Sequence, residues 1–235
     1  MKTATLYIIP TPVAEGDPWM QLPGAVGEAI RSLEYFVVEE LRTVRRFLSA
    51  AGAGRPIDSL HFAVLNEHTS PEEVETLLRP LLEGHDAGLM SEAGTPGVAD
   101  PGAALVALCH ARGIRVAPLP GPCSIILALS ASGLNGQSFA FNGYLPVKAP
   151  ERAKAIRHYE RRAQTEGQSQ AFIEAPYRNL KLLDDLLYVC SPQTMLTVAA
   201  DLLAPAQFIR TAPVAQWRSC SRPDIDKRPA IFIIK

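Results

Sequence analysis

The amino-acid sequence predicts an α/β fold in which two α/β domains follow one another along the chain. Apolar runs of strand length alternate with amphipathic stretches of helix length, a pattern typical of parallel strands joined by helices. The 235 residues suffice for one large domain or two modest ones, and a segment rich in Pro and Gly interrupts the pattern near the middle. We therefore expect domains at residues 1–119 and 120–235.

Five strands and the helices between them account for the first half. The expected strands are residues 4–9, 34–38, 60–64, 87–90 and 114–117. The clearest helix start follows Ser70, which can cap the helix while Pro71 takes its first position and acidic residues its first turn. The buried stripe of this helix is expected to comprise Leu77, Leu78, Leu81 and Leu82. Repeated strand-helix-strand units favour a mostly parallel, doubly wound sheet.

The second half resumes after the segment 119–122, whose Pro and Gly residues prevent a regular element from crossing it. Helices are expected at residues 124–132 and 150–165, and strands at residues 138–144, 170–173, 195–199, 206–210 and 230–234.

Several classes of protein are excluded by composition. No apolar stretch approaches the roughly 20 residues that span a bilayer, and the N-terminus lacks the pattern of a signal peptide. We therefore expect a cytoplasmic protein without a membrane segment. The four cysteines are widely scattered and form no Cys-x-x-Cys or Cys/His cluster, so neither a metal site nor a disulfide framework is expected.

Charge is distributed unevenly between the two halves. Residues 1–119 carry a net charge of -6 and residues 120–235 a net charge of +5. Within the second half, Arg157 and Arg161 share a face of the helix expected at residues 150–165. Together with Arg42, Arg45 and Arg46 they could form a surface for an anionic partner such as RNA. The alternative is an ordinary solvated helix face.

Ligands of open α/β sheets bind beyond the carboxyl ends of the strands, where loops expose backbone amides. Three loops here follow expected strands and are rich in Gly, Pro and small polar residues: 10–12, 91–97 and 120–124. Taken singly, such loops more often only turn the chain.

Taken together, the sequences of these loops are specific to one protein family. SEAGTPGVADPG at residues 91–102 resembles the SDAGTPxxSDPG stretch of the ribosomal RNA small subunit methyltransferase I family, and LPGPCSIILALSASGL at 119–134 resembles its second long motif. Five shorter segments resemble the family in the same order: LYIIPTP at 6–12, VVEELRTVRRFL at 37–48, NEHT at 66–69, GYLP at 143–146 and IEAPYR at 173–178. The resemblance covers nearly all of the chain and lies within the tetrapyrrole methylase superfamily.

This resemblance implies a class III methyltransferase fold, a homodimer, no metal, and S-adenosylmethionine bound in a cleft between the two domains. The implied acceptor is a ribose 2′-hydroxyl of ribosomal RNA. Carried over position by position, the cofactor-binding residues are Pro12, Ala93, Gly94, Thr95, Val98, Gly121, Cys123, Ser124, Glu174, Ala175 and Leu202. Loop amides can bind the methionine carboxylate, apolar side chains can cover the adenine, and the glycines let the backbone come close.

Methyl transfer to a hydroxyl requires that the acceptor be positioned and that its proton be removed. Glu39 is the first candidate for the base, with Arg42 to hold that carboxylate or a phosphate, and Glu92 lies inside the strongest motif. The alternative for Glu39 and Arg42 is a pair that caps a helix. The candidate substrate-binding residues are Arg45, Glu67, His68, Asp100, Arg157 and Arg161.

Purely structural roles are the alternative for some of these candidate residues. Glu67 and His68 could belong to a polar loop before a helix, and Asp100 could bond the backbone amides of a helix start. The family's RELTK segment is replaced by ADLLA at residues 200–204, and full-length family members continue with a C-terminal helical extension that is not seen here. These departures leave open a methyltransferase for a tetrapyrrole or another small molecule, or a non-catalytic module that binds the cofactor or RNA.

Overall fold

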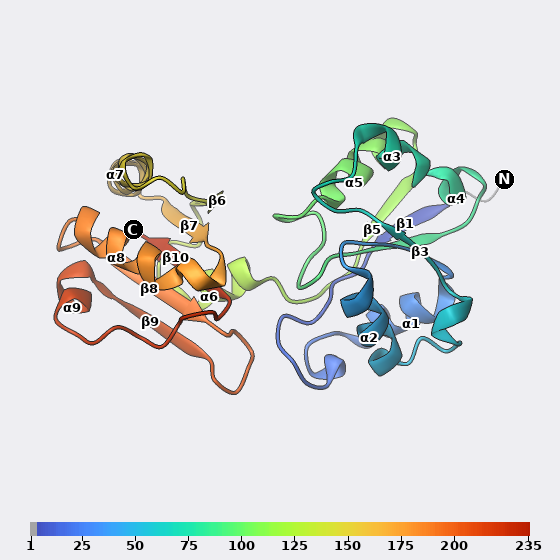
Figure 1. Cartoon of the computed structure of the whole chain (residues 1–235), viewed down its shortest axis with the longest axis horizontal. Helices are drawn as coiled ribbons and strands as arrows, with labels where there is room; N and C mark the ends of the chain where they lie inside the picture. The colour runs from blue at the N-terminus through green and yellow to red at the C-terminus, as the bar shows by residue number, and fades with distance from the viewer. Residues whose placement is uncertain (1–3) are drawn as a thin grey trace. The chain divides into compact units, whose positions relative to one another are not determined.

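The computed structural model describes residues 4–235, which form two compact units, one up to Cys123 and one from Ser124 to Lys235 (Figure 1). We refer to them as unit 1 and unit 2. The division lies after Cys123, four residues beyond the expected boundary after residue 119, in the same Pro- and Gly-rich segment.

Unit 1 is built on a five-stranded sheet in which every pairing is parallel. Its strands are β1 (Thr5–Ile8), β2 (Tyr35–Val38), β3 (His61–Val64), β4 (Ala87–Met90) and β5 (Arg115–Pro118). Their order across the sheet is β3-β2-β4-β1-β5, so β1 and β4 are central neighbours. The predicted parallel sheet is confirmed, and each predicted strand is found within one residue of its expected ends.

Helices cover both faces of this sheet. They are α1 (Gly24–Ser32), α2 (Leu41–Ala51), α3 (Pro71–Thr76), α4 (Arg79–Leu82) and α5 (Gly102–Ala111), with short 3-10 turns η1 (Pro18–Met20) and η2 (Ile57–Ser59). Phe36 and Val38 of β2 pack with α1 and α2, whereas Val37 between them packs with α3, α4 and α5. The alternating side chains of one strand thus serve two hydrophobic layers, as Figure 1 shows for the helices above and below the sheet.

The helix predicted after Ser70 starts as expected but is shorter than expected. The Ser70 hydroxyl accepts from the amide of Glu73, and the Glu73 carboxylate accepts from the amide of Ser70, which completes a capping box. The helix ends at Thr76, and α4 follows separately with Pro80 in its first turn, where the missing N–H costs no bond. The predicted buried stripe is therefore wrong at Leu82, which is 57% exposed.

Unit 2 has a mixed five-stranded sheet of order β6-β7-β10-β8-β9. Its strands are β6 (Phe139–Tyr144), β7 (Ser169–Ile173), β8 (Met195–Ala200), β9 (Phe208–Pro213) and β10 (Ala230–Ile234). Only β6 and β7 pair in parallel, and the other pairs are antiparallel. Its helices are α6 (Ser124–Ser132), α7 (Ala149–Glu166), α8 (Asn179–Val189) and α9 (Val214–Arg218), with the 3-10 turn η3 (Pro176–Arg178).

The core of unit 2 forms around its two central strands. Phe172 of β7 and Phe232 of β10 are fully buried, together with Trp217 of α9 and the leucines of α8. The helix α7 connects β6 to β7 and is the crossover that a parallel pair requires.

Candidate functional site

The three loops that the sequence singled out meet at the carboxyl edge of the unit 1 sheet. Thr11 and Gly94 exchange two backbone hydrogen bonds of 2.9 and 3.1 Å, which join the loop after β1 to the loop after β4. The Thr95 hydroxyl donates to the carbonyl of Pro122 at 3.1 Å and so joins the second loop to the third. Adjacent β1 and β4 thus present their loops as one connected surface.

Two glycines in these loops are required for different structural reasons. Gly94 has a φ of +78°, which L side chains rarely adopt, so a Gly94→Val variant would strain the backbone and not only obstruct a ligand. A Cβ at Gly121 would lie 2.3 Å from Pro10 Cγ. The close approach of Gly121 is therefore made to Pro10 of its own chain.

The carboxylates at the ends of β2 and β4 are coupled through the backbone. Glu39 Oε2 accepts from the amide of Glu92 at 2.9 Å, and the Glu39 amide donates to the carbonyl of Met90 at 3.1 Å. Glu39 is half-buried, whereas the Glu92 side chain is exposed. Glu39 therefore holds the loop that carries Glu92.

Glu39 and Arg42 were expected to pair, but the described part of the chain shows no ion pair between them. The residue that caps α2 is Glu40, whose carboxylate accepts from the amide of Thr43. This bond, more than any other contact, keeps the pKa of Glu40 below its ordinary value, and the charge of Arg42 contributes in the same direction. The helix cap is thus formed by Glu40, whereas Glu39 bonds to the loop after β4.

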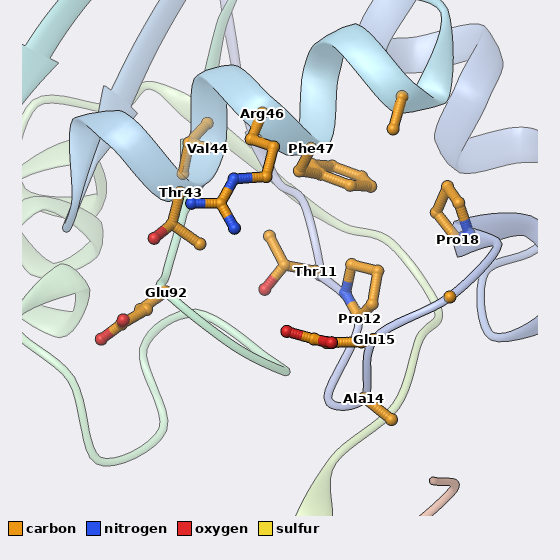
Figure 2. A pocket seen from close by; sticks show the side chains of 12 residues that line it. Thr11, Pro12, Ala14, Glu15, Pro18, Thr43, Val44, Arg46, Phe47 and Glu92 are labelled. Atoms are coloured by element: carbon orange, nitrogen blue, oxygen red, sulfur yellow. The ribbon is translucent and has the colours of Figure 1, made fainter. Parts of the chain in front are cut away.

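A pocket of about 370 Å³ lies in unit 1 between α2 and the loop that follows β1 (Figure 2). One wall is formed by Thr43, Val44, Arg46, Phe47 and Ala50 of α2, and the remainder by Thr11, Pro12, Ala14, Glu15, Gly16, Pro18 and Glu92. Figure 2 shows the guanidinium of Arg46 projecting from α2 toward the space beside this loop, with Glu92 at one end. A mostly apolar wall with a few charged groups is typical of small-molecule sites.

Of two consecutive arginines on α2, only the second lines this pocket. Arg45, a predicted substrate-binding residue, forms an ion pair with Asp58 and lies over the ring of Phe62, 5.7 Å from its centroid. Arg46 is exposed and forms no hydrogen bond or ion pair with the described residues. The spacing of Thr43, Arg46 and Ala50 along one helix face is the signal that could have selected Arg46 from the sequence.

Asp100 organises the second loop. Its Oδ1 accepts from the amides of Gly97 at 2.7 Å and Gly102 at 2.8 Å, as expected for a carboxylate at a helix start. Burial raises the pKa of Asp100 most, the two amides lower it, and the charge of Glu39 raises it further. Val98, within the same loop, is 45% exposed and available to a ligand.

Glu67 and His68 follow the end of β3, the strand beside β2. They occupy a turn after β3, the edge strand, where the amide of His68 donates to Asn66 Oδ1. The two side chains are largely exposed and pair with each other at 3.7 Å. These contacts agree with the polar-loop interpretation.

The unit 2 candidates also follow strand ends. The Glu174 side chain is only 1% exposed, and its Oε1 accepts from the amide of Ala175 and from the guanidinium of Arg178. Leu202 is buried in a turn whose neighbours Asp201 and Leu203 have positive φ values of 47° and 66°. Leu203 is 45% exposed, so this turn offers a ligand the side chain of Leu203 and only the backbone of Leu202.

The helix α7 carries arginines in three different situations. Arg152 is buried, pairs with Asp185, and donates to the carbonyls of Pro146 and Val147, so it fixes the loop before the helix. Arg162 pairs with Glu166. The guanidinium groups of Arg157 and Arg161 are exposed and have no hydrogen bond or ion pair to any described residue, so they are available to an anionic partner.

Residues 4–235 contain no group of three or more His, Cys, Asp or Glu side chains placed to hold a metal ion. The cysteines, Cys109, Cys123, Cys190 and Cys220, are all unpaired thiols. No helix in the described part of the chain is long and apolar enough to cross a bilayer.

The chain has a two-domain α/β fold. Unit 1 has a parallel sheet with Gly- and Pro-rich loops at its carboxyl edge, and unit 2 has a mixed sheet. Residues 16–217 match the family of Tetrapyrrole (Corrin/Porphyrin) Methylases. The chain belongs to this family, as its motifs predicted, and is a methyltransferase.

Its relatives include proteins named Ribosomal RNA small subunit methyltransferase I. The one from Escherichia coli O157:H7 is 32% identical over 229 residues, which cover 97% of this chain and 76% of the relative. The one from Pseudomonas aeruginosa is 34% identical over 216 residues, or 92% of this chain and 72% of the relative.

Solved structures show the same fold at low identity. The methyltransferase CobJ matches with a TM-score of 0.65 and 18% identity, covering 99% of this chain and 94% of that chain. Uroporphyrin-III C-methyl transferase from Thermus thermophilus, complexed with S-adenyl homocysteine, matches with a TM-score of 0.56 and 19% identity, covering 98% and 96%.

Proposed function

We propose that this chain transfers the methyl group of S-adenosylmethionine to a ribose 2′-hydroxyl of small-subunit ribosomal RNA. Its relatives carry that RNA in their names and align with nearly the whole chain. The unit 1 pocket supports the proposal, because Glu92, whose side chain is exposed, lines it together with Thr11 and Pro12 of the loop after β1.

The residues present fit S-adenosylmethionine. The amides at the start of α6, a helix of nine residues, can hold the methionine carboxylate next to Cys123 and Ser124. The Ala93–Gly94 turn presents backbone without bulky side chains, and Val98 is an exposed apolar side chain for the adenine. When bound, S-adenosylmethionine supplies an electrophilic methyl group on a positively charged sulfur.

The protein's part in the reaction is to position the hydroxyl and remove its proton. Glu92 is the better candidate for the base, because its carboxylate is exposed at the pocket whereas Glu39 already accepts from the Glu92 amide. Glu39 is then a positioning residue that fixes the Glu92 loop. Arg46 supplies a positive charge to the phosphate of the acceptor nucleotide.

We further propose that the protein acts in the cytoplasm as a homodimer, as the family resemblance implies. Sedimentation at micromolar concentration tests the dimer, and a species of only 25.4 kDa would contradict it.

The function is tested with S-adenosylmethionine that carries a labelled methyl group. The cofactor is offered to the protein with free ribosomal RNA, isolated small subunits or assembled ribosomes, and the labelled nucleotide is then mapped. Label is expected on a ribose. A 2′-O-methyl group blocks alkaline cleavage of the adjacent phosphodiester, and this resistance identifies the methylated nucleotide. Label on a base, or efficient methylation of a porphyrinoid with none on RNA, would overturn the proposal.

A further inference from the structure

Two tyrosines at the carboxyl edge of unit 2 are unusually exposed. Tyr144 ends β6 and is 62% exposed, and Tyr177 in η3 is 67% exposed. The strands β6 and β7 are parallel neighbours, with Tyr144 opposite Ile173, so both rings follow the same edge of the sheet. Both rings therefore leave much of their surface in water, although they belong to a well-packed unit.

An arginine beside the ring of Tyr177 is held in a fixed place. The Nε and Nη2 atoms of Arg178 donate to Glu174 Oε1 at 3.0 and 2.6 Å, and the Glu174 side chain is almost fully buried. The Arg178 guanidinium carbon lies 5.3 Å from the centroid of the Tyr177 ring. Its pKa is raised mainly by the bond to Glu174, with smaller contributions from the nearby phenols of Tyr177 and Tyr144. Arg178 therefore orders this edge and remains charged.

The surroundings favour an anionic polymer over a small molecule. A small ligand is typically enclosed over most of its surface, but the two rings here are more than half exposed. Lys148, 80% exposed, follows β6 and lies 3.8 Å from the carboxylate of Glu151, and the side chains of Arg157 and Arg161 on α7 have no partner among the described residues. Exposed aromatic rings beside a fixed guanidinium, in a unit that also carries free arginines, are groups that can stack unpaired bases and contact a phosphate backbone.

We propose that Tyr144, Tyr177 and Arg178 form a platform on which an unpaired base of the RNA substrate stacks, while the free arginines of α7 meet flanking phosphates. This inference rests on the proposed function and deepens it, because it assigns RNA recognition to unit 2 and proton removal to unit 1. A base held on the platform would fix the RNA strand relative to the loop of Glu174 and Ala175.

The test compares three tyrosine variants. Tyr144→Leu and Tyr177→Leu remove platform rings, and Tyr188→Leu is the matched control because Tyr188 is 86% exposed on α8, away from the platform. Binding of a fluorescent single-stranded RNA of about 12 nucleotides is followed by anisotropy. Each platform variant should weaken binding by about fivefold or more, and Tyr188→Leu and the conservative Tyr177→Phe should not. Affinity for S-adenosylmethionine, measured by calorimetry, should stay unchanged.

A salt titration separates stacking from charge. Loss of a ring should leave the dependence of log K on log salt unchanged, whereas Arg157→Ala with Arg161→Ala should lower that slope by about one to two. Platform variants that bind RNA as tightly as Tyr188→Leu would overturn the inference. It would also be overturned if these variants kept RNA binding but lost affinity for the cofactor or no longer formed dimers. Failure of the proposed function is read separately, from a wild-type protein that neither binds nor methylates RNA.

Discussion

A glutamate directly follows a parallel strand in each unit, and the two glutamates have opposite electrostatic surroundings. Glu39 after β2 is half-buried and bonded to a backbone amide, and it forms no ion pair with another described residue. Glu174 after β7 is buried and neutralised by Arg178. The same residue type at the same place in a strand-loop unit therefore has a different role in each unit. In unit 1 it holds a loop that carries a second, exposed carboxylate, and in unit 2 it anchors an arginine.

The largest expected effect breaks the unit 2 arrangement. Arg178→Met leaves the Glu174 carboxylate buried without a cation, so the free energy of unfolding should fall by about 3 kcal/mol. Urea unfolding measures the loss. Arg157→Met, on an exposed arginine without partners, is the control and should stay within about 0.5 kcal/mol of the wild type. Equal stability of the two variants would show that the Glu174 carboxylate needs no counter-charge.

The next effect concerns catalysis in unit 1. Glu92→Gln should slow methyl transfer by about 100-fold while the fold and both ligands are retained, because the amide cannot accept the hydroxyl proton. Glu39→Gln should cost less, because its amide oxygen can still accept from the Glu92 backbone. Single-turnover rates at saturating RNA and cofactor measure both. A larger loss at Glu39 than at Glu92 would reverse the roles given to them.

A smaller effect is expected from the two neighbouring arginines of α2. Arg46→Ala should weaken RNA binding by about fivefold, because this side chain lines the pocket and has no partner among the described residues. Arg45→Ala is the matched control, because Arg45 is already paired with Asp58 and packed on Phe62. Filter binding at constant salt compares them. If the two variants bind RNA equally, the pocket does not meet the acceptor strand.

The smallest expected effect is a pH dependence that belongs to Asp100. Its pKa in the folded state is raised above the ordinary value of 3.8, so the folded protein binds a proton more tightly than the unfolded chain does. This contribution to stability is complete below pH 3.8 and is lost as the pH rises through the raised pKa. Relative to Asp100→Asn, the wild-type free energy of unfolding should fall with increasing pH across that interval. Parallel pH profiles in urea titrations would contradict the assignment.

Local patterns predicted unit 1 well. A capping box at Ser70, glycine-rich loops and alternating apolar strands are all encoded by neighbouring residues, so the strands and the positions of the three loops after them followed from the sequence. The mixed sheet of unit 2 did not follow, because β10 inserts between β7 and β8 and such long-range pairing leaves no local signal.

Side-chain partners were the least predictable part of the site. The sequence placed Arg45 and Arg46 together, but the ion pair to Asp58 depends on where η2 packs beside α2. Likewise, Arg152 and Arg157 belong to one basic helix, yet only Arg152 is buried, because Asp185 of α8 lies opposite it. Family resemblance supplied Glu174, but neither its burial nor its pairing with Arg178 could be read from the motif.

The position of β10 has a consequence for synthesis on the ribosome. All five strands of unit 1 lie within the first 118 residues, so this unit can fold as soon as that part of the chain has emerged. The fully buried β10 spans Ala230–Ile234 and joins β7 to β8, so the nascent unit 2 cannot close its sheet until those residues have been translated. Translation proceeds at roughly 5–20 residues per second, so the edges of β7 and β8 remain open for seconds and are open to chaperones in that interval.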